Sequence, residues 1–262
     1  MKHFTLLAFL LICLSGNYAA QILGCTSPYA PNYDPTATLN DGTCTYDVPA
    51  LLESGYCIQE LLDGDVQWQD FRGINYQGGI IVDVSESDGK ALICPETDLS
   101  GGINWGCYGE NVGGASNTMY QGMNNTIEIV TASCTDSPNA ATLCYQSTLN
   151  GYIDWFLPTV SELYTAYNCP NGPGAWDTGS SASTYSYWSS VEANSNSAYR
   201  WNLAYNNSST TSNSYYNSKN TNDINVRPMR YVNISDACLT GGACDDWAYD
   251  GVDLQPENAG VA

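Results

Sequence analysis

The chain has 262 residues, of which 27 are acidic and 7 are lysine or arginine, so its formal net charge is −20. A surface this acidic repels phosphate backbones and anionic lipid headgroups, which argues against nucleic-acid binding and membrane-surface binding. The only histidine is His3, so Ser–His–Asp and Cys–His mechanisms are excluded from the rest of the chain.

Residues 1–20 have the pattern of a secretory signal peptide. Lys2 and His3 precede an apolar run, residues 4–14, that is too short to span a bilayer. Small residues follow, and we place cleavage near Ala20–Gln21. Cleavage removes Lys2, so 6 basic residues remain against 27 acidic ones and the net charge becomes −21. We expect a secreted or cell-surface protein without a transmembrane span.

Ten of the 11 cysteines follow the signal peptide. An even number in an exported chain indicates disulfides, up to five here. Free thiols or a metal site are the alternatives, but there is no CxxC motif and no histidine partner. Pairing between neighbours predicts Cys25–Cys44, Cys94–Cys107, Cys134–Cys144 and Cys238–Cys244, which leaves Cys57 and Cys169 for each other.

Residues 21–47 form a small module bounded by Cys25 and Cys44. It has too few apolar residues for a core, so the disulfide must hold it together. Four side chains could offer oxygen ligands to calcium, and these are Asn32, Asp34, Asn40 and Asp41. The reading that we favour is that they only form turns. Beyond this calcium site, the sequence indicates no cofactor.

Residues 48–74 predict two or three short helices that act as a linker or packing collar. Glycines at nine-residue steps, Gly55, Gly64 and Gly73, each follow a short apolar-acidic run and act as helix stop signals. The expected buried stripe consists of Leu51, Leu52, Leu61, Leu62, Trp68 and Phe71.

Residues 75–234 form the main domain, and residues 235–262 form an acidic tail that carries Cys238 and Cys244. Strands are predicted at 79–84, 90–94, 187–190, 199–204 and 226–232. Helices are predicted at 124–132, at 139–149 and from after Pro158 to about Asn168. Thr159 and Glu162 have capping-box spacing at the start of the last helix. This mixed order indicates an α+β fold with long loops.

Residues 193–225 have an unusual composition, because 24 of the 33 residues are Asn, Ser, Tyr or Thr. Such stretches are usually solvated linkers. Here, however, Trp201 and Leu203 lie within the stretch and apolar residues flank it, which a linker does not need. Tyrosine with asparagine and serine is also the composition of antibody binding loops. The predicted ligand-binding residues are Asn194, Asn196, Tyr199, Asn202, Tyr205, Asn207, Tyr215, Tyr216 and Asn222.

Several strings carry a resemblance to known families. GGIIVDV, ALICPETDLSGGINWGCYG, GYIDWFLPTVSELY, YWSSVE and VRPMRYV occur in this order over roughly residues 75–232. They resemble the C-terminal domain of bacterial collagen-like adhesins and FISUMP-type domains, and the module at 24–46 resembles Cys-bounded repeats of bacterial surface proteins. The resemblance implies a C-type-lectin-like fold with short antiparallel strands, a few helices and long loops, supported by disulfides.

Within that fold, residues 193–225 look most like the variable proteins of diversity-generating retroelements. Adenine-directed mutagenesis of Asn codons in those proteins yields Asn, Ser, Tyr, Thr, Asp, Ile, Ala and others, and this segment is composed mostly of these residue types. Trp201, Leu203 and Lys219 would then be fixed framework. The segment is therefore a candidate hypervariable surface.

The resemblance assigns structural roles to other positions, namely Trp105, Gly106, Cys107, Trp155, Leu157, Pro158, Trp188, Arg227 and Arg230. One of the two arginines is expected to pair with a buried acid, and the candidates are Glu192 and Glu162. The chain lacks the EPN and WND motifs of calcium-dependent lectins, so binding of sugar through calcium is not implied.

Together these features predict a non-enzymatic, adhesin-like protein that binds a protein or glycan partner on another cell or surface. Two other classes stay open. Cys-rich acidic exported chains also build coats and filaments. Paired carboxylates could serve a hydrolase, although with 27 acidic residues some pair will lie close by chance.

Overall fold

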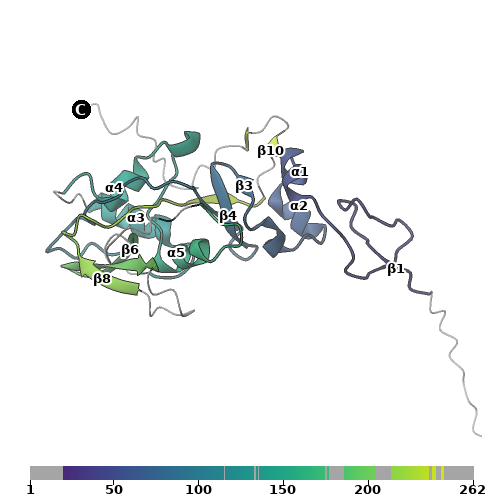
Figure 1. The fold of residues 1–262 in the computed structure, drawn as a ribbon, viewed down its shortest axis with the longest axis horizontal. Coiled ribbons are helices and arrows are strands. Elements are labelled where there is room, and N and C mark those ends of the chain that lie inside the picture. The colour runs from purple at the N-terminus through teal and green to yellow at the C-terminus, as the bar shows by residue number, and fades with distance from the viewer. Residues whose placement is uncertain are drawn as a thin grey trace, which may run out of the picture. The chain divides into compact units, whose positions relative to one another are not determined.

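The computed structural model describes residues 20–114, 116–132, 134, 136–174, 176, 186–203, 214–235, 238–239 and 243–244. The chain divides into two compact units, the first ending at Tyr46 and the second beginning at Asp47. Figure 1 shows the helices and strands of both units, coloured from purple at the N-terminus to yellow at the C-terminus.

The first unit is held by a short parallel pairing and one disulfide. β1 (Leu23–Gly24) pairs in parallel with β2 (Leu39–Asn40). Cys25 and Cys44 are bonded, with their Cα atoms 4.8 Å apart, which confirms the predicted pair. The covalent link closes a segment in which only Cys25 and Ala30 are buried apolar residues among those described.

Three short helices begin the second unit, as the sequence predicts. They are α1 (Val48–Glu53), α2 (Ile58–Asp63) and the 3-10 helix η1 (Trp68–Phe71). The backbone N–H of Gln59 donates to the carbonyl of Ile234 at 2.9 Å, and that of Gly73 donates to the carbonyl of Ile81 at 2.8 Å. These bonds join the helical segment to the sheet that follows it.

The predicted apolar stripe of this segment is only partly buried. Leu52, Leu61 and Phe71 lie in the core, and Leu51 and Leu62 are half-buried. Trp68 is 37% exposed, so its prediction as a buried residue is wrong. It lies at the first position of η1, where the guanidinium of Arg72 lies 5.8 Å from the centre of its ring.

A four-stranded antiparallel sheet follows, in the order β3-β4-β5-β9. Its strands are β3 (Asn75–Tyr76), β4 (Gly79–Ser85), β5 (Lys90–Cys94) and β9 (Arg230–Asn233). The predicted strands at 79–84 and 90–94 are confirmed. The last strand begins at Arg230 and not at Val226, because Pro228 has no N–H to donate to a ladder. Val226 and Met229 form isolated bridges instead.

The main helices are α3 (Gly122–Thr131), α4 (Ala140–Tyr145) and α5 (Val160–Tyr167), with the 3-10 turn η2 (Leu149–Gly151) after α4. The predicted helix at 139–149 is therefore too long. The hydroxyl of Ser147 accepts a hydrogen bond from the N–H of Leu149 at 3.2 Å, and such local bonds compete with continuation of a helix.

The capping box that begins α5 is confirmed. The hydroxyl of Thr159 accepts from the N–H of Glu162 at 3.2 Å, and the Glu162 carboxyl accepts from the N–H of Thr159 at 2.7 Å. Glu162 is fully buried and also accepts a hydrogen bond from the hydroxyl of Tyr231. Removal from water raises the pKa of Glu162 above its ordinary value of 4.5, despite these hydrogen bonds.

This raised pKa predicts a pH dependence of stability. A carboxyl whose pKa is higher in the folded than in the unfolded chain contributes stability that is fully present below its unfolded pKa. That contribution is lost as the pH rises through the folded pKa. The free energy of unfolding of the natural protein, minus that of Glu162→Gln, should therefore fall as pH rises from about 4 to about 8 in chemical denaturation. A constant difference would show that the carboxyl does not titrate differently on folding.

A second antiparallel sheet has the order β6-β7-β8. Its strands are β6 (Ser186–Asn194), β7 (Ser197–Asn202) and β8 (Ser214–Ser218). β6 contains the predicted strand at 187–190. The predicted strand at 199–204 overlaps β7 only over 199–202, because β7 ends at Asn202. A short hairpin of β10 (Cys238–Leu239) and β11 (Ala243–Cys244) ends the described part.

Two clusters of buried apolar residues make up much of the core in the described ranges. One combines residues of β4, β5 and α5 with Phe156 and Tyr231, and the other gathers around Trp105, Trp188 and helix α4. Helices and mainly antiparallel strands in one chain confirm the α+β class. No helix in the described ranges is both long and apolar enough to cross a bilayer.

The cysteine pairing differs from the prediction in the second unit. Cys107 is bonded to Cys134, across 27 residues, so the pairs Cys94–Cys107 and Cys134–Cys144 are wrong. Cys94 and Cys144 are fully buried free thiols in the two core clusters, where burial raises their pKa. Cys107 is also buried, in the same cluster as Cys144, so burial alone does not determine which cysteines pair.

Two further predicted pairs have different outcomes. Cys57 and Cys169 are separate buried thiols, so that pair is also wrong: Cys57 caps helix α2, and Cys169 lies close to the carbonyl of Ile81. The backbone of β10 and β11 places Cys238 opposite Cys244. Their side chains are outside the described part, so this pair stays a prediction.

Candidate ligand-binding surface

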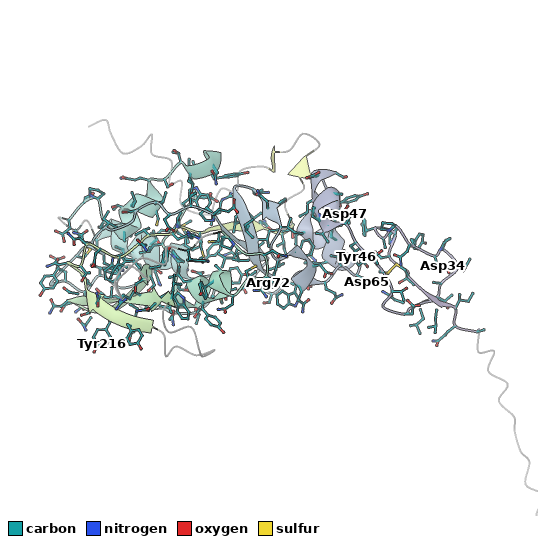
Figure 2. All side chains as sticks on the ribbon, viewed as in Figure 1. Asp34, Tyr46, Asp47, Asp65, Arg72 and Tyr216 are labelled. Carbon is teal, nitrogen blue, oxygen red and sulfur yellow. A yellow bond between two sulfur atoms is a disulfide. The ribbon has the colours of Figure 1, made fainter. Side chains whose placement is uncertain are left out.

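The β6-β7-β8 sheet separates the predicted tyrosines onto opposite faces. Tyr199 lies directly opposite Tyr216, with the ring centres 6.3 Å apart in an edge-to-face arrangement. Tyr216 is 64% exposed and points away from the body of the unit in Figure 2. Tyr215 projects from the other face, where the guanidinium of Arg200 lies 6.0 Å from its ring centre. One face of β8 therefore presents Tyr216 to solvent and the other presents Tyr215.

Predicted asparagines gather at one end of this sheet. Asn194, the last residue of β6, and Asn196, in the turn between β6 and β7, are both exposed. The Asn194 side chain accepts a hydrogen bond from the N–H of Asn196 at 2.9 Å. The N–H of Lys219 donates to the carbonyl of Asn196 at 3.0 Å, which joins this turn to the loop after β8. Asn222 is exposed in that loop. We call the end of the sheet formed by residues 194–196 and by the loop at 219–223 the turn end.

Asn202 does not belong to the surface. It is 1% exposed, opposite Ser186 in the register of β6 and β7, so its prediction as a binding residue is wrong. The reason is that the C-terminal end of β7 enters the core, where Trp201 meets the ring of Tyr164 on α5 at 5.3 Å. The predictions at Tyr205 and Asn207 lie outside the described residues.

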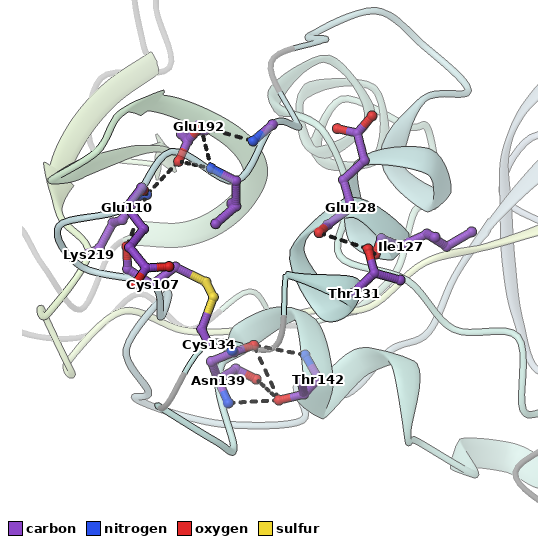
Figure 3. The surroundings of a disulfide bond; sticks show 12 residues. Cys107, Glu110, Ile127, Glu128, Thr131, Cys134, Asn139, Thr142, Glu192 and Lys219 are labelled. Carbon is purple, nitrogen blue, oxygen red and sulfur yellow. Dashed lines mark hydrogen bonds and ion pairs between the residues drawn. A yellow bond between two sulfur atoms is a disulfide. The ribbon is translucent and has the colours of Figure 1, made fainter. Parts of the chain in front are cut away.

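A buried ion pair fixes the base of the turn end (Figure 3). The Nζ of Lys219 lies 2.5 Å from the carboxylate of Glu192 on β6, and the Lys219 side chain is fully buried. The same Nζ donates to the carbonyl of Glu110 at 2.7 Å and to that of Cys107 at 3.4 Å, and it lies 4.7 Å from the centre of the Trp105 ring.

Glu192, the partner of Lys219, contacts a later part of the loop that contains Cys107 and Glu110. Its carboxylate accepts hydrogen bonds from the N–H of Val112 at 3.1 Å and from the N–H of Gly113 at 3.2 Å. The Cys107–Cys134 disulfide ties the start of the same loop to the segment after α3. Residues 107–113 are therefore held in two ways. A disulfide bonds Cys107 to the segment after α3, and backbone groups of the loop form hydrogen bonds with the paired side chains of Lys219 and Glu192.

This loop brings an additional aromatic side chain to the turn end. Tyr108 is 49% exposed, and the N–H of the next residue, Gly109, donates to the carbonyl of Ser195 at 2.8 Å. Sequence reasoning missed Tyr108, because it treated the whole string around Cys107 as framework. The available signal was a tyrosine next to glycines, since Gly106 and Gly109 have φ of 92° and 93°, which favours glycine.

The residues assigned to framework by resemblance are all buried, including the four large side chains Trp105, Trp155, Leu157 and Trp188. The indole N–H of Trp105 donates to the carbonyl of Ser189 at 2.8 Å, and that of Trp188 donates to the carbonyl of Ile103 at 2.8 Å. Buried tryptophans that satisfy their N–H groups in this way lock the sheet to the preceding loops.

The two arginines have partners other than the predicted ones. Arg227 pairs with Asp98 at 2.5 Å, and Arg230 pairs with Asp154 at 2.7 Å. Glu192 is used by Lys219, and Glu162 caps α5, so neither is available to an arginine. Both arginines do pair with an acid, but Asp98 and Asp154 are half-buried and not buried as expected, and they lie in loops that the sequence did not place nearby.

The calcium candidates of the first unit form turns. The Asp34 carboxylate accepts from the N–H and hydroxyl of Thr36, and Asp41 does the same with Thr43, and these bonds lower the pKa of both carboxyls. Asn32 and Asn40 also accept backbone N–H groups. No cluster of three or more histidine, cysteine or acidic side chains suited to a metal occurs in the ranges described. The turn reading explains these residues.

No protein-family model matches this chain, and no curated protein shows significant sequence similarity to it. The surface must therefore be interpreted from its own geometry and chemistry.

Proposed function

We propose that this chain is a secreted or cell-surface binding protein that holds a protein or glycan partner through its tyrosine- and asparagine-bearing surface. The observation that carries the proposal is the contrast in exposure between side chains of the β6-β7-β8 sheet and the loop that follows it. Tyr216 is 64% exposed, whereas Trp201 and Lys219 are at most 1% exposed. Exposed aromatic and amide side chains on a rigid base are the composition and setting of protein binding loops.

The finer assignment rests on the resemblance of the motifs. We propose a C-type-lectin-like domain of the adhesin type, with a hypervariable segment at 193–225. Its α+β class and its long anchored loops support this fold, and the disulfides support an oxidising, extracellular setting. The split within the segment, with Trp201, Leu203 and Lys219 buried and several Asn and Tyr residues exposed, supports variation at the surface positions alone.

A binding role accounts for the surface better than hydrolysis by paired carboxylates. Such hydrolases place two carboxyl groups on either side of the scissile bond. A cavity of about 320 Å³ in the second unit is lined by Asn75, Thr97 and Asn150, and Glu96 is its one carboxylate. Glu162, the fully buried acid, is engaged in helix capping.

The variable-protein part of the proposal has a genetic test. The same locus should be sequenced in closely related strains, together with its neighbourhood. We expect differences to be concentrated in codons of 193–225 and to spare Trp201 and Lys219. Uniform variation along the gene, or the lack of a near-repeat of this segment beside a reverse transcriptase gene, would count against the retroelement hypothesis and leave the binding role open.

The binding role itself is tested by exchanging one tyrosine. We expect Tyr216→Ala to weaken binding to any probe retained on a printed array of glycans and extracellular proteins by about tenfold or more, the size of an aromatic hot spot. Tyr215→Ala tests the opposite face of the same strand, and Tyr56→Ala, a tyrosine exposed in the helical segment, is the control. Retention of probes with unchanged affinity by both β8 variants would exclude β8 as part of the binding surface.

A further inference from the structure

The basic side chains of the described part are buried or half-buried, where they contact acids or aromatic rings. Of the six basic residues in the described part, none is exposed. Lys219, Arg227 and Arg230 are at most 5% exposed and paired with acids. The remaining three are half-buried, each within 6.0 Å of the centre of an aromatic ring, and these are Arg72, Lys90 and Arg200.

The exposed charge is consequently of one sign. Every charged residue that is exposed in the described part is an aspartate or a glutamate. In each of the three ion pairs, the positive charge is neutralised by the acid that it contacts. These three basic residues therefore do not offset the exposed acids. The negative charge of the described part is therefore displayed to solvent, where it acts on approaching partners.

The turn end combines this charge with its exposed aromatic and amide groups. Glu110 lies two residues from Tyr108 in the anchored loop, and Asp223 follows Asn222; both acids are exposed. The Lys219 side chain holds the backbone of Glu110, and the Lys219 N–H holds the turn at Asn196, so these segments are neighbours. The carboxylates thus flank the same loops that present Tyr108 and the asparagines.

We propose that the turn end binds a protein partner through arginine and lysine side chains on that partner. This inference rests on the proposed binding function and names its partner class. A guanidinium stacks on an exposed tyrosine ring and pairs with a carboxylate through its planar fork, so both features of the turn end suit it. An anionic glycan is repelled by the same acids, and a neutral glycan gains no ionic attraction from them.

The experiment uses the full mature chain and defined peptides. The probes are a fluorescein-labelled peptide of repeated Arg-Ser-Gly, its lysine and glutamate counterparts, and a labelled neutral glucan oligosaccharide, all followed by anisotropy. We expect the arginine peptide to bind most tightly, the lysine peptide less tightly and the glutamate peptide not at all. Binding should weaken as salt is raised, because exposed charges are screened.

Matched variants separate the turn end from general charge attraction. Glu110→Gln with Asp223→Asn should weaken binding of the arginine peptide by about fivefold. Glu53→Gln with Glu86→Gln removes the same charge from exposed sites elsewhere and should change it by less than about twofold. Tyr108→Ala should also weaken binding, whereas Tyr56→Ala, a tyrosine exposed in the helical segment, should not.

Three results would overturn this inference. They are equal losses in the two charge-matched pairs, no binding of the arginine peptide, or binding of the neutral glucan in its place. A neutral glucan whose affinity falls in Tyr216→Ala would leave the proposed binding function standing while contradicting the basic partner. Failure of the binding function itself would be seen as an array that retains no probe, together with no binding of any peptide or of the glucan.

Discussion

Lys219→Met is expected to lower the free energy of unfolding by about 3–5 kcal/mol, the cost of removing one partner from a buried ion pair. The Lys219 side chain is fully buried, and the Glu192 side chain is only 8% exposed, so the remaining carboxylate cannot regain its hydration without opening the structure. The substitution also removes the bonds to the carbonyls of Cys107 and Glu110.

Urea denaturation of the natural protein and the variant measures this effect. Adding Glu192→Gln to Lys219→Met removes the uncompensated charge and should recover part of the lost stability, so the two substitutions should not be additive. Lys90→Met is the control, because Lys90 is half-buried at the start of β5 and lies over the ring of Tyr231. Equal losses at Lys219 and Lys90 would show that the ion pair contributes nothing special.

Arg230→Ala is the second large effect, and we expect a loss of about 3 kcal/mol. The guanidinium makes two hydrogen bonds to Asp154, at 2.7 and 2.9 Å, and a third to the carbonyl of Gln77 at 2.9 Å. It also lies 3.9 Å from the centre of the Tyr152 ring. The Asp154 side chain is 24% exposed and can rehydrate in part, so the loss should be smaller than for Lys219.

Arg230→Lys distinguishes charge from geometry at this site. Lysine keeps the positive charge but cannot reproduce the planar fork or the stacking, so its stability should lie between those of the natural protein and Arg230→Ala. Thermal melts followed by circular dichroism provide the measurement. A melting temperature that is the same in all three proteins would mean that the pair adds nothing to the stability of the fold.

Local patterns in the sequence were sufficient for the elements that local chemistry determines. The Thr159–Glu162 box predicted where α5 begins, and the apolar runs around Ser87-Asp88-Gly89 predicted the β4–β5 hairpin. These features depend on residues a few positions apart, and their physical signals are contained in the sequence. The α+β class followed from the order of such elements.

Features that depend on distant segments could not be predicted in the same way. The partner of Cys107 is set by where the loop after α3 returns, and proximity in sequence favoured the wrong cysteine. The acids beside Arg227 and Arg230 come from loops 129 and 76 residues away. Asn202 was assigned to the surface by composition, but the register of β7 against β6 places it inside.

The anchor of the loop at 107–113 depends mostly on main-chain groups. Lys219 holds carbonyl oxygens of this loop, and Glu192 holds N–H groups of it, so neither contact requires a particular side chain at positions 108–112. Substitutions at positions 108 and 110 can therefore change the side chains that this loop presents while the path of its backbone is preserved. The same arrangement makes this loop a suitable place to graft new recognition residues by design.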